Sequence, residues 1–562
     1  MIRTSEKAFL VKILSWVALV ATLAITPSLT VDPINLPKLA VISLGGFMSL
    51  AFAVSRWKVI FTSNLRGPIL IVLLFVFDLV LVLFLAGSNF NQEFYGTFGR
   101  STGFVAYISL AGLLIAGIIS ATDYSLKRFS VVLLIVGAIS IAYGFLQAQG
   151  ADPVSWAKGL NPVIGFVGNP NFQSSLVAFC AVSAFAILLG VSSGRTKVGL
   201  AVFLVLAAYI IYKTQSQQGF VVLVGGISIV LVIFINKSSA KKFTWPLISA
   251  GFVAVILTAL GSLNKGPLAA LLFEESVTYR GDYWRAGWKM TVDNPIFGLG
   301  LDNYGDWYRR SRTLEATLRR GPEIVSSSAH NVLLDISSGG GFPLVVLYLI
   351  IQLLVLRAAI RVIRRNPKFD PYFTGLFAVW ISYQAQSLIS INQLGLAVWG
   401  WVISGLIIGF EIHGRTLERN QEITKQSRNG KTAPIRNNQE VLPSTLMVLF
   451  VGLLIGLLAG LPPFLASSKF KSALDSTNAV SIMNSAKSFP QDGYRSVQVA
   501  YVLHQNKLDA QALPVILEAT KKFPDVFDAW KVLNSLSTAT PAQLAEAKAQ
   551  MKRLDPFNPE LK

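Results

Sequence analysis

The sequence predicts an all-α polytopic membrane protein with about thirteen transmembrane helices, a large extracytoplasmic loop and a C-terminal helical-repeat tail. Of its 562 residues, 53% are hydrophobic and 14% are charged, whereas soluble domains have roughly 25% charged residues. The hydrophobic residues gather in blocks that are long enough to cross ~30 Å of hydrocarbon as helices. They lack the strict alternation of a membrane β-barrel. These observations exclude a soluble enzyme and a disordered chain.

The predicted membrane domain covers residues 1–466, and its spans lie between charged or Pro/Gly-rich breaks. Nine spans precede the long loop at 261–340: Phe9–Ile25, Leu39–Val54, Pro68–Ala86, Gly103–Ala121, Phe129–Ala148, Phe172–Val191, Val198–Tyr212, Gly219–Ile235 and Trp245–Leu260. Four spans follow it: Gly341–Ala359, Phe373–Ile391, Leu394–Ile412 and Ser444–Leu465. Basic residues precede the first span and no cleavage site follows it, so we expect a retained anchor.

The chain has 49 Lys and Arg against 29 Asp and Glu, and the excess lies mainly in alternate short loops. Such an alternation predicts membrane orientation rather than nucleic-acid binding. The basic side includes the N-terminus and the run from Arg415 to Arg436, whereas the opposite loops hold mainly Lys38, Arg100, Lys158 and Lys213. We therefore expect the N-terminus inside and the C-terminus outside, with residues 261–340 also outside. The single cysteine, Cys180, excludes disulfides and multi-cysteine metal sites.

The tail, residues 467–562, has a repeated pattern. Phe489-Pro490 recurs 34 residues later as Phe523-Pro524, and Asp555-Pro556 follows 32 residues after that. This spacing resembles tetratricopeptide repeats, which stack helix pairs into docking surfaces for protein partners. A helical cap packed on the membrane domain is the alternative.

Candidate functional residues gather in the long loop rather than in the spans. Asp78 is the only clear acid in the middle of a span, which argues against an ion-coupled transporter. Helical spacing places Arg280, Trp284 and Trp288 on one face, where a guanidinium would grip phosphate oxygens. An interfacial helix anchored by aromatic residues is the alternative.

His330 precedes a long apolar helix and is the best general-base candidate, although its position suits a structural histidine equally well. No cluster of His, Asp and Glu has the spacing of metal ligands, so we expect no metal.

These residues resemble motifs of the O-antigen ligase and O-antigen polymerase family. The matching segments are Arg280 with Trp284, the Pro295–Gly300 turn, His330-Asn331, the run from Gly168 to Phe172, and the run from Gly99 to Gly103. One departure is that the family often has Ser-Arg where this chain has Ser216-Gln217. Arg285 or Arg100 would then substitute for the missing arginine, or the donor would be held differently.

The resemblance implies a GT-C-like membrane glycosyltransferase that needs neither metal nor cofactor. It would transfer a glycan from an undecaprenyl-diphosphate-linked donor to a glycan, lipid or protein acceptor at the outer face of the cytoplasmic (inner) membrane. It assigns catalysis to Arg280 and His330. The predicted substrate-binding residues are the motif residues Arg100, Asn331, Trp284, Asn169 and Asn171, together with Arg285 as a candidate substitute for the missing arginine and Gln217 in that arginine's place. A ligase is the leading reading and a polymerase of the same family is the alternative. A lipid-linked-glycan flippase or exporter, or a peptidoglycan polymerase, fits the sequence less well.

Overall fold

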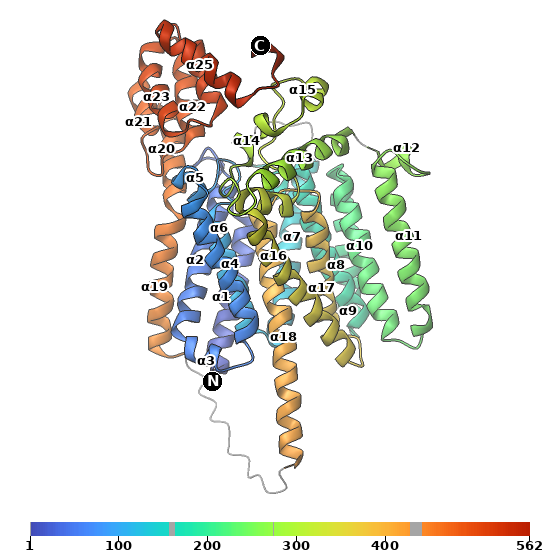
Figure 1. Cartoon of the computed structure of the whole chain (residues 1–562). Helices are drawn as coiled ribbons and strands as arrows, with labels where there is room; N and C mark the ends of the chain where they lie inside the picture. The colour runs from blue at the N-terminus through green and yellow to red at the C-terminus, as the bar shows by residue number, and fades with distance from the viewer. Residues whose placement is uncertain (1, 157–162, 274, 427–440, 562) are drawn as a thin grey trace.

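The computed structural model describes residues 2–156, 163–273, 275–426 and 441–561, and within them every regular element is a helix (Figure 1). Lys158 and the end of the basic run before residue 441 lie outside the described residues. In the described part, ten helices are long and apolar enough to cross a membrane: α2 (Asn35–Ser55), α4 (Arg66–Leu85), α7 (Asp123–Ala148), α8 (Pro170–Gly190), α9 (Gly194–Lys213), α10 (Gln217–Asn236), α11 (Thr244–Ser262), α16 (Val332–Arg365), α18 (Leu394–Gln426) and α19 (Pro443–Gly460). The predicted class, an all-α polytopic membrane protein, is confirmed.

Three further helices coincide with the other predicted spans: α1 (Thr4–Leu23), α6 (Phe104–Ser120) and α17 (Pro371–Ser387). All thirteen predicted spans are thus helical, while the number that cross the membrane stays a prediction. Several helices differ from their expected bounds: α18 continues to Gln426 rather than ending at Ile412, and α19 ends at Gly460 rather than at Leu465. In the tenth span, α16 begins at Val332 rather than at Gly341. Residues 332–340 of the predicted loop therefore belong to this helix.

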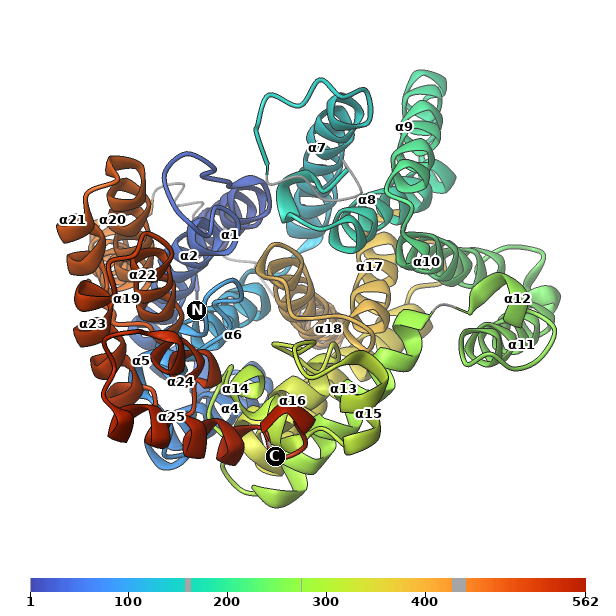
Figure 2. The same cartoon turned by 90° about the horizontal axis from the view of Figure 1, so that it is seen from above.

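The centre of the membrane domain is formed by α6 and α18. Almost every residue of α6 is buried, and α18 contacts α1, α6, α16 and α17. Figure 2 shows α18 near the middle of the assembly and α11 at its edge. A helix that is apolar all round is suited to burial in such a position.

The helices of the membrane domain that are not predicted spans gather mostly at one end of the bundle. These are α5 (Phe90–Tyr95), α12 (Ala269–Leu272), α13 (Glu275–Asp293), α14 (Tyr304–Ser311) and α15 (Leu314–Arg320), while α3 (Trp57–Phe61) lies at the other end (Figure 1). The tail lies at the same end as α13 to α15, which we call the tail face, and the N-terminus lies at the opposite end (Figure 1). The compartment that the tail face meets stays a prediction. Within the described residues, three 3₁₀ turns complete the regular structure: η1 (Gly165–Val167), η2 (Lys241–Phe243) and η3 (Pro559–Leu561).

The tail consists of helices with their own apolar core, which includes Trp530 and Leu533. The helices are α20 (Pro462–Ser476), α21 (Ala479–Ser485), α22 (Gly493–Gln505), α23 (Asp509–Lys522), α24 (Phe527–Ser535) and α25 (Pro541–Leu554). The first of them, α20, begins at Pro462 and so crosses the predicted domain boundary at residues 466 and 467. The three recurring X-Pro pairs follow α21, α23 and α25, so each pair ends a two-helix unit. The assignment of these units as tetratricopeptide repeats stays a prediction.

A buried ion cluster joins the tail to the loop before α16. Asp555, which is fully buried, accepts hydrogen bonds from Arg312 Nη2 at 2.8 and 2.9 Å and from Arg309 Nη1 at 3.1 Å. The Arg309 guanidinium also lies over the ring of Phe527, 4.1 Å from its centre. The tail is therefore packed on the membrane domain through specific charged contacts.

Candidate functional site

The Pro295–Gly300 turn is fixed against a kink in α16. The Phe342 N–H donates to the Pro295 carbonyl at 2.8 Å, and the Leu299 N–H donates to the Ser338 carbonyl at 2.8 Å. Gly341, at the kink, has a φ of 73°, and a Cβ there would lie 2.4 Å from the Ile296 carbonyl oxygen. Glycine is the residue that tolerates both this φ and this approach, so the turn positions the first part of α16 on the tail face.

Arg100 holds three segments of the tail face together. Its Nε donates to Asp302 Oδ1 at 2.9 Å, and its Nη2 lies 3.4 Å from Asp335 Oδ2. Asp302 Oδ2 also accepts from the backbone N–H groups of Thr97 and Thr102. The predicted role of Arg100 in donor binding is untested, but its buried guanidinium is already paired with two carboxylates. In the structure, the contacts of Arg100 with Asp302 and Asp335 fix the start of α16.

Asp335 connects Arg100 to the segment that contains His330. It accepts hydrogen bonds from Ser328 Oγ at 2.9 Å and from the Ala329 N–H at 2.8 Å. Ser328 Oγ in turn accepts from the His330 N–H at 2.8 Å. His330 has a φ of 52°, an uncommon value for a residue other than glycine, and these bonds hold it there. The histidine is therefore placed by a defined chain of contacts.

The imidazole of His330 is half-buried and stacks on Tyr283, with ring centres 5.2 Å apart. Its Nδ1 lies 3.3 Å from the Ser328 carbonyl oxygen, which only accepts hydrogen bonds. We therefore assign the proton to Nδ1 and the lone pair to Nε2. The pKa of His330 is lowered to about 4, first by burial and then by the positive charges of Arg100, Arg280 and Arg320. The ring is thus neutral at physiological pH.

Helix α13 brings cationic and aromatic residues beside this histidine. The influence of Arg280 on the His330 pKa reflects their proximity. Arg285 is more than half exposed and pairs with Asp282 Oδ1 at 3.0 Å. Trp284 is half-buried, and its indole Nε1 has no hydrogen-bond partner among the described residues. Helix α13 therefore carries N–H groups of the kind that hydrogen-bond to an anionic ligand.

Three residues around His330 had no predicted role: Tyr283, Arg320 and Asp335. Arg320 donates to the Tyr283 hydroxyl and lies over the ring of Tyr279, 3.8 Å from its centre. Arg320 ends a stretch of the long loop that is rich in arginine, from Arg309 onward, and this clustering was a usable signal for Arg320. Asp335 lies four residues after Asn331, so the helical period was a weak signal for the second.

Asn331, Asn169 and Asn171 have clear local contacts. Asn331 caps α16 by accepting from the Leu333 and Leu334 N–H groups, and its Nδ2 donates to the Leu388 carbonyl. Asn169 caps α8 by accepting from the Asn171 N–H at 2.8 Å. These bonds explain the residue type without a ligand, and the predicted binding roles remain untested.

A second polar group lies where α8 and α10 begin. Asn171 Oδ1 accepts from Ser216 Oγ at 2.7 Å, and Gln218 Nε2 donates to Ser175 Oγ at 3.1 Å. Gln217, which stands where the family often has arginine, is exposed as the first residue of α10. Its side chain is thus available to a ligand, and its predicted role stays a prediction.

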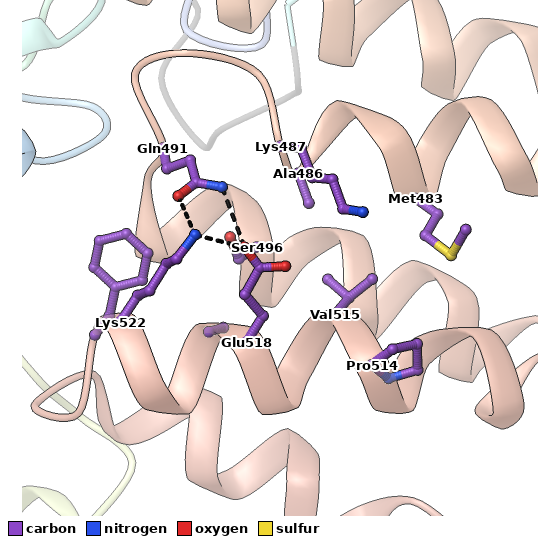
Figure 3. A pocket seen from close by; sticks show the side chains of 11 residues that line it. Met483, Ala486, Lys487, Gln491, Ser496, Pro514, Val515, Glu518 and Lys522 are labelled. Atoms are coloured by element: carbon purple, nitrogen blue, oxygen red, sulfur yellow. Dashed lines mark hydrogen bonds and ion pairs between the residues drawn. The ribbon is translucent and has the colours of Figure 1, made fainter.

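The tail contains a cavity of about 140 Å³ between α21, α22 and α23 (Figure 3). At one end, Lys522 Nζ donates to Gln491 Oε1 and Glu518 Oε1, each at 2.6 Å. Met483 and Val515 line the other end (Figure 3). The predicted site residues do not line this cavity, so we leave it outside the candidate site.

In the part of the chain that the structure describes, no group of three or more His, Cys, Asp or Glu side chains is arranged to hold a metal ion. Metal independence stays a prediction.

A comparison with models of known families finds a match that includes α13, the Pro295–Gly300 turn and the start of α16. Residues 201–349 match the family model described as O-antigen ligase, and they include Arg280, the Pro295–Gly300 turn and His330. A comparison with curated proteins finds no match. A domain of this family indicates a glycosyl-transfer enzyme of the ligase or polymerase type that acts on lipid-linked glycans. The predicted resemblance to the O-antigen ligase family is therefore confirmed over residues 201–349: the chain is a multi-pass membrane protein that carries an O-antigen ligase domain.

Proposed function

We propose that this protein transfers a glycan from an undecaprenyl-diphosphate-linked donor to an acceptor hydroxyl at the outer face of the cytoplasmic membrane. The observation that carries the proposal is a neutral histidine, His330, held beside several arginines on the tail face. A base and an anion-binding group are the two functions that this transfer requires from the protein.

In the proposed reaction, Nε2 of His330 accepts the proton of the acceptor hydroxyl. The acceptor oxygen forms a bond to the anomeric carbon, while the bond from that carbon to the diphosphate oxygen breaks. The electron pair of the broken bond stays on the lipid diphosphate. This single displacement inverts the anomeric configuration.

Arg280, helped by Arg285, would stabilise the negative charge that develops on the leaving diphosphate. Its guanidinium is suited to this role because it stays charged at any physiological pH and presents paired donors. An anion bound there would offset the positive charges that lower the pKa of His330. Donor binding would therefore make His330 a stronger base at the moment when a base is required.

Reconstitution into proteoliposomes tests the function. The assay supplies lipid-linked glycan and an acceptor, and it measures both glycosylated acceptor and released undecaprenyl diphosphate. The two products should form in equal amounts. Movement of intact donor across the bilayer without cleavage of the sugar-phosphate bond would instead identify a flippase. Growth of the glycan on a second lipid-linked unit would identify a polymerase.

A further inference from the structure

A cavity of about 350 Å³ lies between the tail and the tail face of the membrane domain. The membrane domain contributes residues around α5 and the segment Val325–Ser327, and the tail contributes Pro490–Arg495. We propose that this cavity is a binding subsite for a carbohydrate chain, namely the acceptor glycan. This proposal deepens the proposed function and rests on it.

The cavity wall combines an aromatic surface with hydroxyl-binding groups. Phe98 and Tyr494 stack with ring centres 4.3 Å apart and an angle of 8° between the rings, and Tyr494 is 43% exposed. A sugar ring has an apolar C–H face and a rim of hydroxyls, so it is recognised by an aromatic surface with carboxylates or amides beside it. Tyr494 also presents a hydroxyl of its own.

Asp306 is the main polar group on the membrane-domain side. Its Oδ2 accepts from Gln92 Nε2 at 2.6 Å, whereas its Oδ1 accepts no hydrogen bond within the described residues. Burial and the nearby carboxylates of Asp525 and Asp492 raise the pKa of Asp306 to about 7. Near neutral pH the group both accepts and donates, as sugar hydroxyls do.

Arg495 supplies a buried polar atom without a partner, on the tail side. The residue lines the cavity and is only 5% exposed. Its Nη2 donates to the carbonyls of Ser488 and Pro490, but its Nε has no hydrogen-bond partner in the described part of the chain. A buried donor without a partner costs free energy, which a ligand hydroxyl would recover.

The position of the cavity favours an acceptor chain. Ser326 lines the cavity, and its Oγ lies 3.4 Å from Nδ1 of His330. A chain bound there would end beside the imidazole of His330, on the side of Nδ1 rather than of the basic Nε2. The volume falls within the range of small-ligand sites, roughly 300–1,000 Å³. A stable protein interface needs about 800 Å² on each partner, so a protein partner fits this cavity less well.

The direct test measures binding of oligosaccharides released by mild acid from the surface polysaccharide of the producing cells. Saturation-transfer NMR on the full-length protein in detergent gives the dissociation constants. We expect Tyr494→Ala to weaken binding at least tenfold and Tyr494→Phe to retain it, because phenylalanine keeps the stacking surface. Tyr501→Ala is the matched control, since Tyr501 is also exposed on α22 but does not line the cavity. Equal binding by the Tyr494→Ala and Tyr501→Ala proteins, or no binding by the parent, would overturn the proposal.

A second test uses Asp306→Asn, a substitution that preserves the shape of the side chain. In the transfer assay, this variant and Tyr494→Ala should raise KM for the acceptor about tenfold while KM for the donor stays within twofold. An unchanged acceptor KM in both variants would refute the subsite even if transfer is real. Oligosaccharide binding that depends on Tyr494 in a protein that transfers no glycan would support the subsite and reject the proposed function.

Discussion

Replacing Asp555 with asparagine should loosen the tail from the membrane domain. The substitution keeps the shape of the side chain but removes the charge that Arg309 and Arg312 share at 2.8–3.1 Å. Both guanidiniums are at least nine-tenths buried, so water cannot replace the lost carboxylate freely. The same arginines donate to the carbonyls of Pro322 and Ile324, which begin the segment that leads to His330. The perturbation should therefore reach the candidate site.

The expected cost follows from the burial of the cluster. Removing one partner of a buried ion pair costs about 3–5 kcal/mol, because it leaves an uncompensated charge. At 1.36 kcal/mol per factor of ten, a detached tail would become on the order of 10²- to 10⁴-fold more populated. Asp525→Asn is the control: Asp525 pairs with Arg310 at 3.0 Å but is 42% exposed, and such a pair contributes about 1 kcal/mol or less.

Limited proteolysis of the detergent-solubilised protein measures this effect. Cleavage between residues 321 and 329 should be much faster in Asp555→Asn than in the parent, and the midpoint of thermal unfolding should fall. Asp525→Asn should behave nearly like the parent. If the two variants are cleaved at the same rate, the buried cluster does not hold the tail and the reasoning fails.

Three further predictions concern the candidate site. The pKa of His330 is lowered to about 4, so its neutral, basic form persists above that pH. The value of kcat/KM for the donor should therefore stay level from pH 8 to about 5 and fall near pH 4. A fall in kcat/KM near pH 6.5 would contradict the lowered pKa of His330. The fall in kcat should occur at a higher pH than the fall in kcat/KM, since the bound diphosphate offsets the arginine charges. If both fall at the same pH, no anion lies beside the histidine in the donor complex. Arg280→Lys should keep part of the donor affinity and Arg280→Ala little, as measured by binding of undecaprenyl diphosphate, whereas equal affinities would remove Arg280 from the donor site. Gln217→Arg should leave donor affinity unchanged or improve it slightly, and a severe loss would mean that this region is built for a different donor.

The helices of the membrane domain could be predicted from the sequence because each is a continuous apolar segment, and the hydropathy of a segment depends only on the residues within it. The beginning of α16 could not be predicted in the same way. Its first turns, from Val332, precede the apolar stretch, and the kink at Gly341 depends on a turn at Pro295 that lies 46 residues earlier. Local patterns therefore predict spans well and their interruptions poorly.

The candidate site was predictable to the extent that its motifs lie in one loop. Arg280, Trp284 and His330 were found from their spacing and their family resemblance. The partners of Arg100, however, are separated from it by 202 and 235 residues, and the contact of Asp555 with Arg312 spans 243 residues. A single sequence carries no signal for such pairs, although they determine where His330 lies and how its charge is controlled.

The central claim, that His330 is the base for glycan transfer, is tested most directly by comparing two histidine variants in the reconstituted transfer assay. His330→Ala should lower turnover on the order of 10²-fold or more while undecaprenyl diphosphate still binds with nearly the parent affinity. His504→Ala, which alters a tail histidine bonded to Asp509 at 2.7 Å, should transfer glycan at nearly the parent rate. A folded His330→Ala protein that transfers glycan as fast as the parent would contradict the account.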